Sequence, residues 1–143
     1  MMNNRSRLTA LETGASSGIG KSIAKRLIAD GYLVYVAARS TDKMADLAQL
    51  GAVPLTMDIS KEAGILAAVA TITERSGGVD VLVNNAGYGP YGPVEDIALD
   101  EARYQFEVNV FGPDRPTQLL LPSMQARGKG TIVNITSMGG QGL

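Results

Sequence analysis

The sequence contains neither cysteine nor histidine. These absences exclude disulfides, thiolate nucleophiles, zinc sites built from either residue, and the Ser-His-Asp triad. Imidazole is also missing as a general acid or base, so any chemistry must use hydroxyls, carboxylates, amides, amines or a cofactor, and we predict no metal site. Apolar runs are short: the longest, near residues 119–121, falls far below the roughly 20 residues that a membrane helix needs. With no signal sequence visible, we expect a cytoplasmic protein without a membrane segment.

Positive and negative side chains are almost balanced in number in this sequence. Its 143 residues include 13 Lys and Arg against 14 Asp and Glu, which gives a net charge of -1. A protein that binds nucleic acid or a membrane surface needs a basic face, so neither is an expected partner. A hydrophobic fraction of 45% and a charged fraction of 19% are ordinary for a globular chain. The length fits one domain over residues 1–143.

Predicted strands and helices alternate along the chain. Strands are predicted over 8–11, 32–38, 53–57, 80–84 and 130–136. Helices are predicted between them: one with Ile19, Ile23 and Leu27 on its apolar face, one capped by Ser40 or Thr41, one capped by Ser60 with Ile65, Leu66, Val69 and Ile72 buried, one from Asp100 to Val110, and one from near Pro113 to Arg127. This alternation predicts a parallel sheet in a doubly wound α/β domain. Ligands bind such domains beyond the carboxyl ends of the strands.

The first predicted strand runs into a glycine-rich turn, Thr13-Gly14-Ala15-Ser16-Ser17-Gly18-Ile19-Gly20. Glycines allow the backbone to approach a phosphate closely, and Gly20 allows the helix to pack against the strand. The following helix directs its N–H groups and positive dipole end toward an anion, and Ser16 and Ser17 add hydroxyl donors. The turn therefore predicts a dinucleotide phosphate site; the alternative is a glycine-rich turn without a ligand.

The second predicted strand ends in Ala38-Arg39-Ser40. An acidic residue at this point would bind the ribose 2′-hydroxyl of NAD, whereas a guanidinium can hold a 2′-phosphate through two hydrogen bonds. Arg39 and Ser40 therefore favour NADP over NAD. The alternative is an arginine on a solvated loop.

These features, together with later motifs, resemble the amino-terminal portion of the short-chain dehydrogenase/reductase family. The later motifs are Asp58 after the third strand, Asn84-Asn85-Ala86-Gly87, Asn109 within Val108–Gly112, and Ser137 within Asn134–Gly140. The resemblance implies a Rossmann-like sheet with strand order 3-2-1-4-5 that lacks the family's last strands.

The resemblance also implies a role for each motif residue. Asp58 and Ile59 would contact adenine, and Asn85, Ala86 and Gly87 would line the cofactor cleft. Asn109 would hold a water for a proton relay, and Ser137 would bind the substrate oxygen. Structural roles compete with these: Asp58 could cap the turn into the next helix, and Asn84 and Asn85, at the end of the fourth strand, could satisfy loop backbone groups. Asn109 could bond its own helix, and Ser137 could belong to a turn.

By resemblance, the function is hydride transfer between NADP(H) and an alcohol, ketone or aldehyde. The family's general acid is the tyrosine of a Tyr-x-x-x-Lys motif that lies beyond the serine. No tyrosine in this sequence has a lysine four residues later, and only residues 138–143 follow Ser137. We therefore expect a fifth strand with an exposed edge and a chain that is inactive by itself. The alternatives are a non-catalytic NADP-binding module and a folding fragment.

Three residues depart from the expected pattern. Glu12 stands in a strand that should be buried on both faces, so its carboxylate needs a partner or a raised pKa. Asp114 and Pro116 fall near the start of the last predicted helix, where Pro116 removes a hydrogen bond or delays the helix. Homo-oligomers could form through the helices of residues 100–127, by resemblance, or through the edge of the fifth strand.

Overall fold

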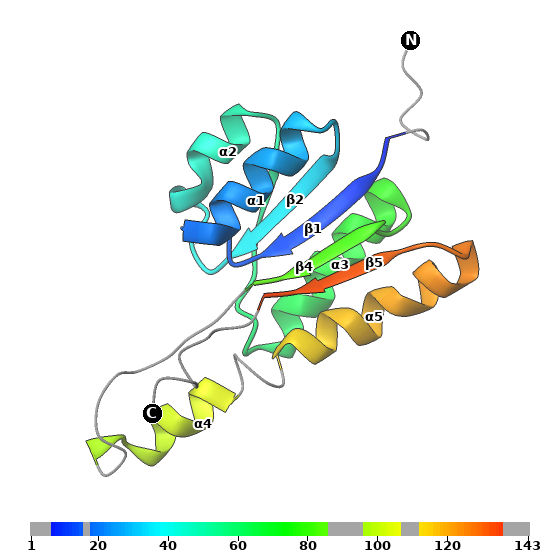
Figure 1. Ribbon diagram of the computed structural model, residues 1–143. Helices are drawn as coiled ribbons and strands as arrows, with labels where there is room; N and C mark the ends of the chain where they lie inside the picture. Colours follow the sequence, from blue (N-terminus) through cyan, green and yellow to red (C-terminus); the bar gives the residue numbers. More distant parts are fainter. Residues whose placement is uncertain (1–6, 16–17, 86–95, 107–111, 136–143) are drawn as a thin grey trace.

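The sheet consists of five parallel strands in the order β3-β2-β1-β4-β5. Figure 1 shows the computed structural model, which describes residues 7–15, 18–85, 96–106 and 112–135. The strands are β1 (Thr9–Thr13), β2 (Leu33–Ala38), β3 (Val53–Thr56), β4 (Val81–Asn84) and β5 (Thr131–Asn134). The helices are α1 (Gly18–Ala29), η2 (Asp42–Met44, a 3-10 helix), α2 (Ala45–Gln49), α3 (Glu62–Ser76), α4 (Leu99–Phe106) and α5 (Gly112–Arg127). The predicted α/β fold and strand order are confirmed.

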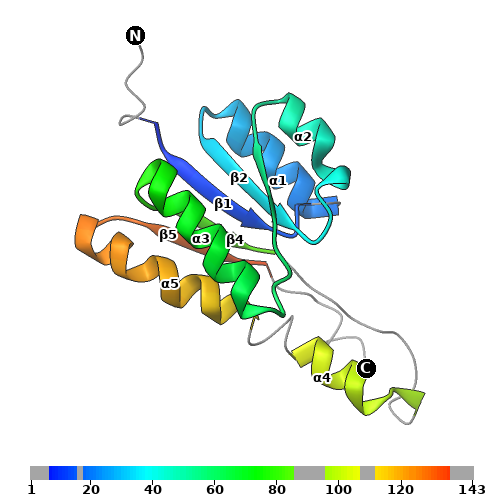
Figure 2. The ribbon, with the colours of Figure 1, turned by 180° about the vertical axis from the view of Figure 1, so that it is seen from behind.

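Helices cover both faces of the sheet. Helices α1 and α2 lie on one face, and α3 and α5 lie on the other, as Figures 1 and 2 show. Successive residues of β1 point to opposite faces, so Ala10 joins the apolar cluster beneath α1 and α2, whereas Leu11 joins the cluster beneath α3 and α5. Because both faces are covered, every residue of β1 is buried, which is the expected state of a central parallel strand.

Two side chains predicted to be buried are exposed. Ile19 in α1 is 65% exposed and Leu66 in α3 is 42% exposed. The buried residues of α1 are Gly20 and Ala24. These residues mark the face of α1 that packs against the sheet, and Ile19 lies outside that face. An apolar stripe of period 3.6 fixes only a narrow range of positions, and neighbouring apolar residues can fall outside it.

The predicted helix caps were wrong. Thr41 is the residue before η2 and makes no side-chain hydrogen bond to that helix. Met44, and neither Ser40 nor Thr41, is the residue before α2. Lys61, not Ser60, precedes α3. The hydroxyl and N–H of Ser60 instead donate to Oδ1 of Asp58, at 2.6 and 2.9 Å. The carboxylate is a strong acceptor two residues upstream, so the serine closes a turn and does not cap the helix.

Pro116 lies inside α5 and is buried. The helix begins at Gly112, so the proline removes a helical hydrogen bond without delaying the helix. Asp114 is exposed in the first turn, where a carboxylate interacts favourably with the positive end of the helix dipole. No helix among the described residues is long and apolar enough to cross a membrane.

Helix α4 lies apart from the two covering layers. Figures 1 and 2 show it beyond the carboxyl ends of the strands, on the side toward which the arrows point. The predicted continuation to Val110 lies outside the described residues. This position brings α4 to the edge where ligands bind doubly wound sheets.

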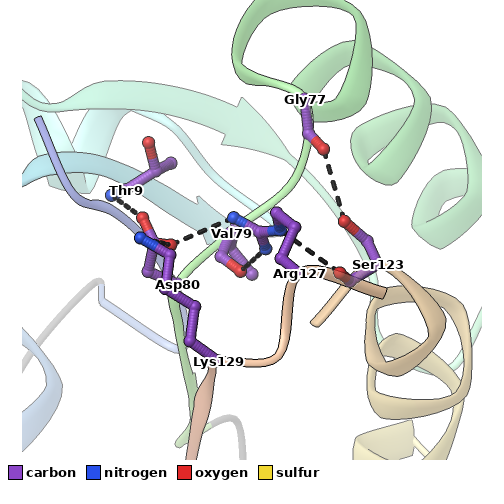
Figure 3. A network of polar contacts seen from close by, with 7 residues as sticks. All are labelled: Thr9, Gly77, Val79, Asp80, Ser123, Arg127 and Lys129. Carbon is purple, nitrogen blue, oxygen red and sulfur yellow. Dashed lines mark hydrogen bonds and ion pairs between the residues drawn. The ribbon is translucent and has the colours of Figure 1, made fainter. Parts of the chain in front are cut away.

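A polar network joins three elements at the opposite edge of the sheet (Figure 3). One carboxylate oxygen of Asp80 accepts the N–H of Thr9 at 2.8 Å, and the other accepts Nη1 of Arg127 at 3.0 Å. Nη2 of Arg127 donates to the carbonyl oxygen of Val79 at 2.6 Å, and Nζ of Lys129 lies 3.7 Å from the carboxylate. The Asp80 side chain is only 14% exposed, so this network connects the starts of β1 and β4 to the end of α5 in a partly dry environment.

We expect Asp80→Ala to lower the free energy of unfolding by about 1–3 kcal/mol, because it leaves a buried N–H without its acceptor. Urea unfolding measures the change. Asp30→Ala is the matched control, since it removes an exposed ion pair with Arg26 and should cost less than about 0.5 kcal/mol. Equal losses in the two variants would contradict a stabilising role for the network.

Candidate functional site

The glycine-rich turn connects β1 to α1 at the carboxyl edge of the sheet. Gly14 has a φ of 74°, and its N–H donates to the carbonyl oxygen of Ala37 at 2.9 Å. Gly18, the first residue of α1, has a φ of 59°, and no described atom lies within 4 Å of the position that a Cβ would take there. Both conformations favour glycine. Ser16 and Ser17 lie outside the described residues.

Gly20 lies where α1 approaches the sheet most closely. A Cβ at this position would overlap the carbonyl oxygen of Gly14 and Nδ2 of Asn85, and would stand 2.6 Å from Oε1 of Glu12. Only a glycine allows this approach, which confirms its predicted packing role. The approach sets the start of α1 directly above the end of β1.

Asn85 ties the end of β4 to the turn. Its Nδ2 donates to the carbonyl oxygen of Gly14 at 3.2 Å, and its N–H donates to Oγ1 of Thr13 at 3.0 Å. Asn84 makes different contacts: its Nδ2 donates to Oδ1 of Asn134 at 2.9 Å and to Oγ1 of Thr117 at 3.2 Å. Both asparagines therefore have the structural role that the sequence left open. Ala86 and Gly87 lie outside the described residues.

Glu12 is fully buried beneath the turn. Neither of its carboxylate oxygens has a hydrogen-bond partner within the described part of the chain. Burial raises the pKa of Glu12 to about 8, although the neighbouring Asn85 amide acts in the opposite direction. The expectation of a partner or a raised pKa is thus met by the raised pKa, and the carboxyl group is mostly protonated at neutral pH.

Arg39 follows β2 at the same edge of the sheet and is exposed, as is Ser40. Nη1 of Arg39 donates to the hydroxyl oxygen of Tyr104 on α4, at 3.1 Å. Sequence reasoning missed this contact because the two residues stand 65 positions apart. No local pattern signals which end of the sheet an isolated helix will occupy.

Asp58 follows β3, one strand further along the edge. Its partial burial by itself would raise the pKa of its carboxyl group, but hydrogen bonds from Ser60 and the charges of Arg39 and Lys61 lower that pKa overall. The carboxylate of Asp58 therefore carries a negative charge that interacts with the positive charge of Arg39. The side chain of Ile59 is buried in the cluster beneath α3 and α5, so it packs the core.

The structure brings most of the predicted cofactor residues to one edge. The described members are Gly14, Gly18, Ile19, Gly20, Arg39, Ser40, Asp58, Ile59 and Asn85. The predicted catalytic residues Asn109 and Ser137 lie outside the described residues. Within those residues, no group of three or more acidic side chains is placed to hold a metal ion.

The donor set at this edge fits an anionic nucleotide. The first turn of α1 leaves N–H groups without helical partners. No described atom lies within 4 Å of the position that a Cβ would take at Gly18. Arg39 adds a cation at the neighbouring strand end. A pyrophosphate at the turn and a second phosphate at Arg39 would each meet donors of the right charge.

Comparisons with known proteins agree with this geometry. The family model for short chain dehydrogenases matches residues 8–142. A "Probable NADP-dependent dehydrogenase" of Haemophilus influenzae is 39% identical over 136 residues, which cover 92% of this chain and 54% of that protein.

Solved structures are similar as well. A short-chain dehydrogenase from Streptomyces avermitilis has a TM-score of 0.89 and 43% identity, covering 95% of this chain and 51% of that one. The actinorhodin polyketide ketoreductase with NADPH has a TM-score of 0.90 and 40% identity, covering 99% of this chain and 58% of that one.

The chain spans about half the length of the curated relatives that it matches. The family model matches almost the whole sequence. The strand order, the glycine-rich turn and the motif at the end of β4 agree with that match. The chain therefore belongs to the short-chain dehydrogenase family.

Proposed function

We propose that this chain forms a single NADP(H)-binding domain of a cytoplasmic oxidoreductase, which transfers a hydride between the nicotinamide and the carbon of an alcohol, ketone or aldehyde. The observation that carries the choice of cofactor is Arg39, an exposed cation at the end of β2. NAD-binding proteins of this architecture use an acidic residue at this point. The names of an NADP-dependent relative and of a solved neighbour with NADPH support the same choice.

We assign the cofactor-binding roles in order along the carboxyl ends of the strands. The glycine-rich turn, with Ser16 and Ser17, and the start of α1 bind the pyrophosphate, and Arg39 and Ser40 bind the 2′-phosphate. Asp58 and the backbone of Ile59 border the adenine, while Asn85, Ala86 and Gly87 line the cofactor cleft. When bound, NADPH supplies the hydride.

Two further residues would act on the substrate. Ser137 holds the substrate oxygen by a hydrogen bond, and Asn109 holds a water that relays a proton. The 143 residues contain no Tyr-x-x-x-Lys, and loss of a general acid costs roughly 10²–10⁴-fold in rate. For this chain by itself we therefore propose cofactor binding without sustained turnover.

We expect NADPH to bind more tightly than NADH, and Arg39→Ala to erase most of the difference. A charge-assisted hydrogen bond to an ionised group contributes about 1.5–3 kcal/mol, so NADPH should bind about 10–100-fold more weakly to the variant. NADH affinity should barely change. Fluorescence titration of the reduced cofactors measures both dissociation constants.

Arg26→Ala is the matched control, because Arg26 lies in the last turn of α1, at the far end from the glycine-rich turn. It removes the same charge and should leave the preference intact. Equal affinities for NADPH and NADH in the parent protein would contradict the choice of cofactor. Sustained NADPH oxidation with ketones or aldehydes would contradict binding without turnover.

A further inference from the structure

Tyr104 on α4 touches the residue that we assign to the 2′-phosphate. Its aromatic ring packs against the apolar cluster beneath α3 and α5, and the residue is half-buried. Its hydroxyl oxygen accepts a hydrogen bond from Nη1 of Arg39 at 3.1 Å. The tyrosine therefore has an anchored end in the core and a polar end at the carboxyl edge of the sheet, where Figure 1 shows α4.

The contact restricts a long side chain at an exposed position. Arg39 is exposed, and a long exposed arginine loses considerable rotamer entropy when a ligand immobilises it. A tyrosine has only two side-chain torsions, so its hydroxyl occupies a well-defined place once the ring is packed. The hydrogen bond that Nη1 of Arg39 donates to this hydroxyl oxygen holds the guanidinium before any ligand arrives.

The chemistry of the partner matters as much as its position. A guanidinium has five N–H donors, so one bond to Tyr104 leaves donors for a second acceptor. The acceptor on Tyr104 is a hydroxyl oxygen and not a carboxylate, so this hydrogen bond does not form an ion pair with Arg39. The carboxylate of Asp58 interacts with the charge of Arg39, but its hydrogen-bonded oxygen accepts the N–H and the hydroxyl of Ser60. Arg39 is thus positioned by an oxygen that does not cancel its charge.

We propose that Tyr104 is a positioning residue for cofactor selectivity: its hydroxyl holds the Arg39 guanidinium where the 2′-phosphate of NADP(H) binds. This inference rests on the proposed NADP(H) binding. It assigns to α4, an element outside the glycine-rich turn and the neighbouring strand ends, a part in distinguishing NADPH from NADH.

The test is Tyr104→Phe, which keeps the ring in the core and removes only the hydroxyl. Dissociation constants for NADPH and NADH are measured by fluorescence titration of the purified chain. We expect NADPH to bind about 2- to 10-fold more weakly, the range set by ordering one long side chain, with NADH affinity changed less than about twofold. Tyr32→Phe is the matched control, because Tyr32 lies just before β2, at the opposite edge of the sheet; it should leave the ratio of the two constants unchanged.

A second variant distinguishes positioning from a general effect on the fold. In the Arg39→Ala background, Tyr104→Phe should no longer change NADPH affinity, because its effect passes through the guanidinium. An equal loss of affinity for both cofactors would overturn the inference, since a merely structural role acts on both. An unchanged ratio in Tyr104→Phe, with a reduced ratio in Arg39→Ala, would overturn the inference and leave the proposed cofactor standing. A parent protein that does not prefer NADPH would overturn both.

Discussion

Replacing Glu12 by glutamine is expected to raise the free energy of unfolding at pH 8 by about 3–5 kcal/mol, and by about 1 kcal/mol or less at pH 5. Glu12 is fully buried, and its carboxylate oxygens have no hydrogen-bond partner within the described residues. Glutamine has nearly the same shape and cannot ionise. The variant therefore removes the cost of keeping an acid in an environment that disfavours its charge.

The direction of the pH dependence follows from the two pKa values of Glu12. In the unfolded chain the carboxyl group loses its proton near the ordinary value of 4.5, whereas in the folded protein burial raises the pKa to about 8. Between these values the folded state binds more protons than the unfolded state, so stability falls as the pH rises. One proton corresponds to about 1.4 kcal/mol per pH unit, so the total loss attributable to Glu12 is about 5 kcal/mol.

Urea unfolding at several pH values between 5 and 8 measures this dependence. The parent protein should lose stability steadily over the range, and Glu12→Gln should lose much less. Glu74→Gln is the matched control, because Glu74 is exposed on α3; its pH dependence should follow that of the parent. A Glu12→Gln variant that parallels the parent curve would contradict a protonated Glu12 beneath the turn.

Gly20→Ala is expected to destabilise the protein by about 3 kcal/mol or more, and to abolish cofactor binding. The added Cβ would overlap the carbonyl oxygen of Gly14 and the side-chain amide of Asn85, and would crowd Oε1 of Glu12. Overpacking a close-packed site costs roughly 1–3 kcal/mol, occasionally more, and here one of the overlapped atoms is backbone. Relief requires α1 to move away from β1, which displaces its N–H groups from the turn.

Gly64→Ala provides the opposite case in the same protein. Gly64 lies in the first turn of α3, and an added Cβ would have its nearest neighbour, the backbone nitrogen of Asp58, at 3.7 Å. Alanine is favoured over glycine in a helix by roughly 0.5–1 kcal/mol, so this variant should be as stable as the parent or more so. Thermal unfolding of the two variants compares them directly. Similar melting temperatures would show that α1 does not approach the sheet as closely as the structure describes.

Much of the site could be read from local sequence. Val34 and Val36 lie in a continuous apolar run, which is typical of a strand covered on both faces. The glycine-rich turn stands between such a strand and an amphipathic helix, so its place at the carboxyl edge follows from the order of elements. Arg39 is found by counting from that turn. Each of these predictions depends on neighbours in the chain.

Other features depended on contacts between distant residues. The exposure of Ile19 and Leu66 depends on how each helix is rotated against the sheet. Figure 3 shows the clearest example: Asp80, Arg127 and Thr9 meet from three separate elements. No sequence spacing predicts such a meeting.

The sequence by itself determined the class of fold, the strand order through its family resemblance, and the position of the cofactor edge, because periodicity and turn chemistry are local properties. Only the tertiary structure decided the states of Glu12 and Arg39. Glu12 takes its raised pKa from burial beneath α1, and Arg39 takes its position from a tyrosine on a helix 65 residues away. A pKa and a side-chain position both depend on the atoms that surround a group in space, and folding brings those atoms from distant parts of the chain.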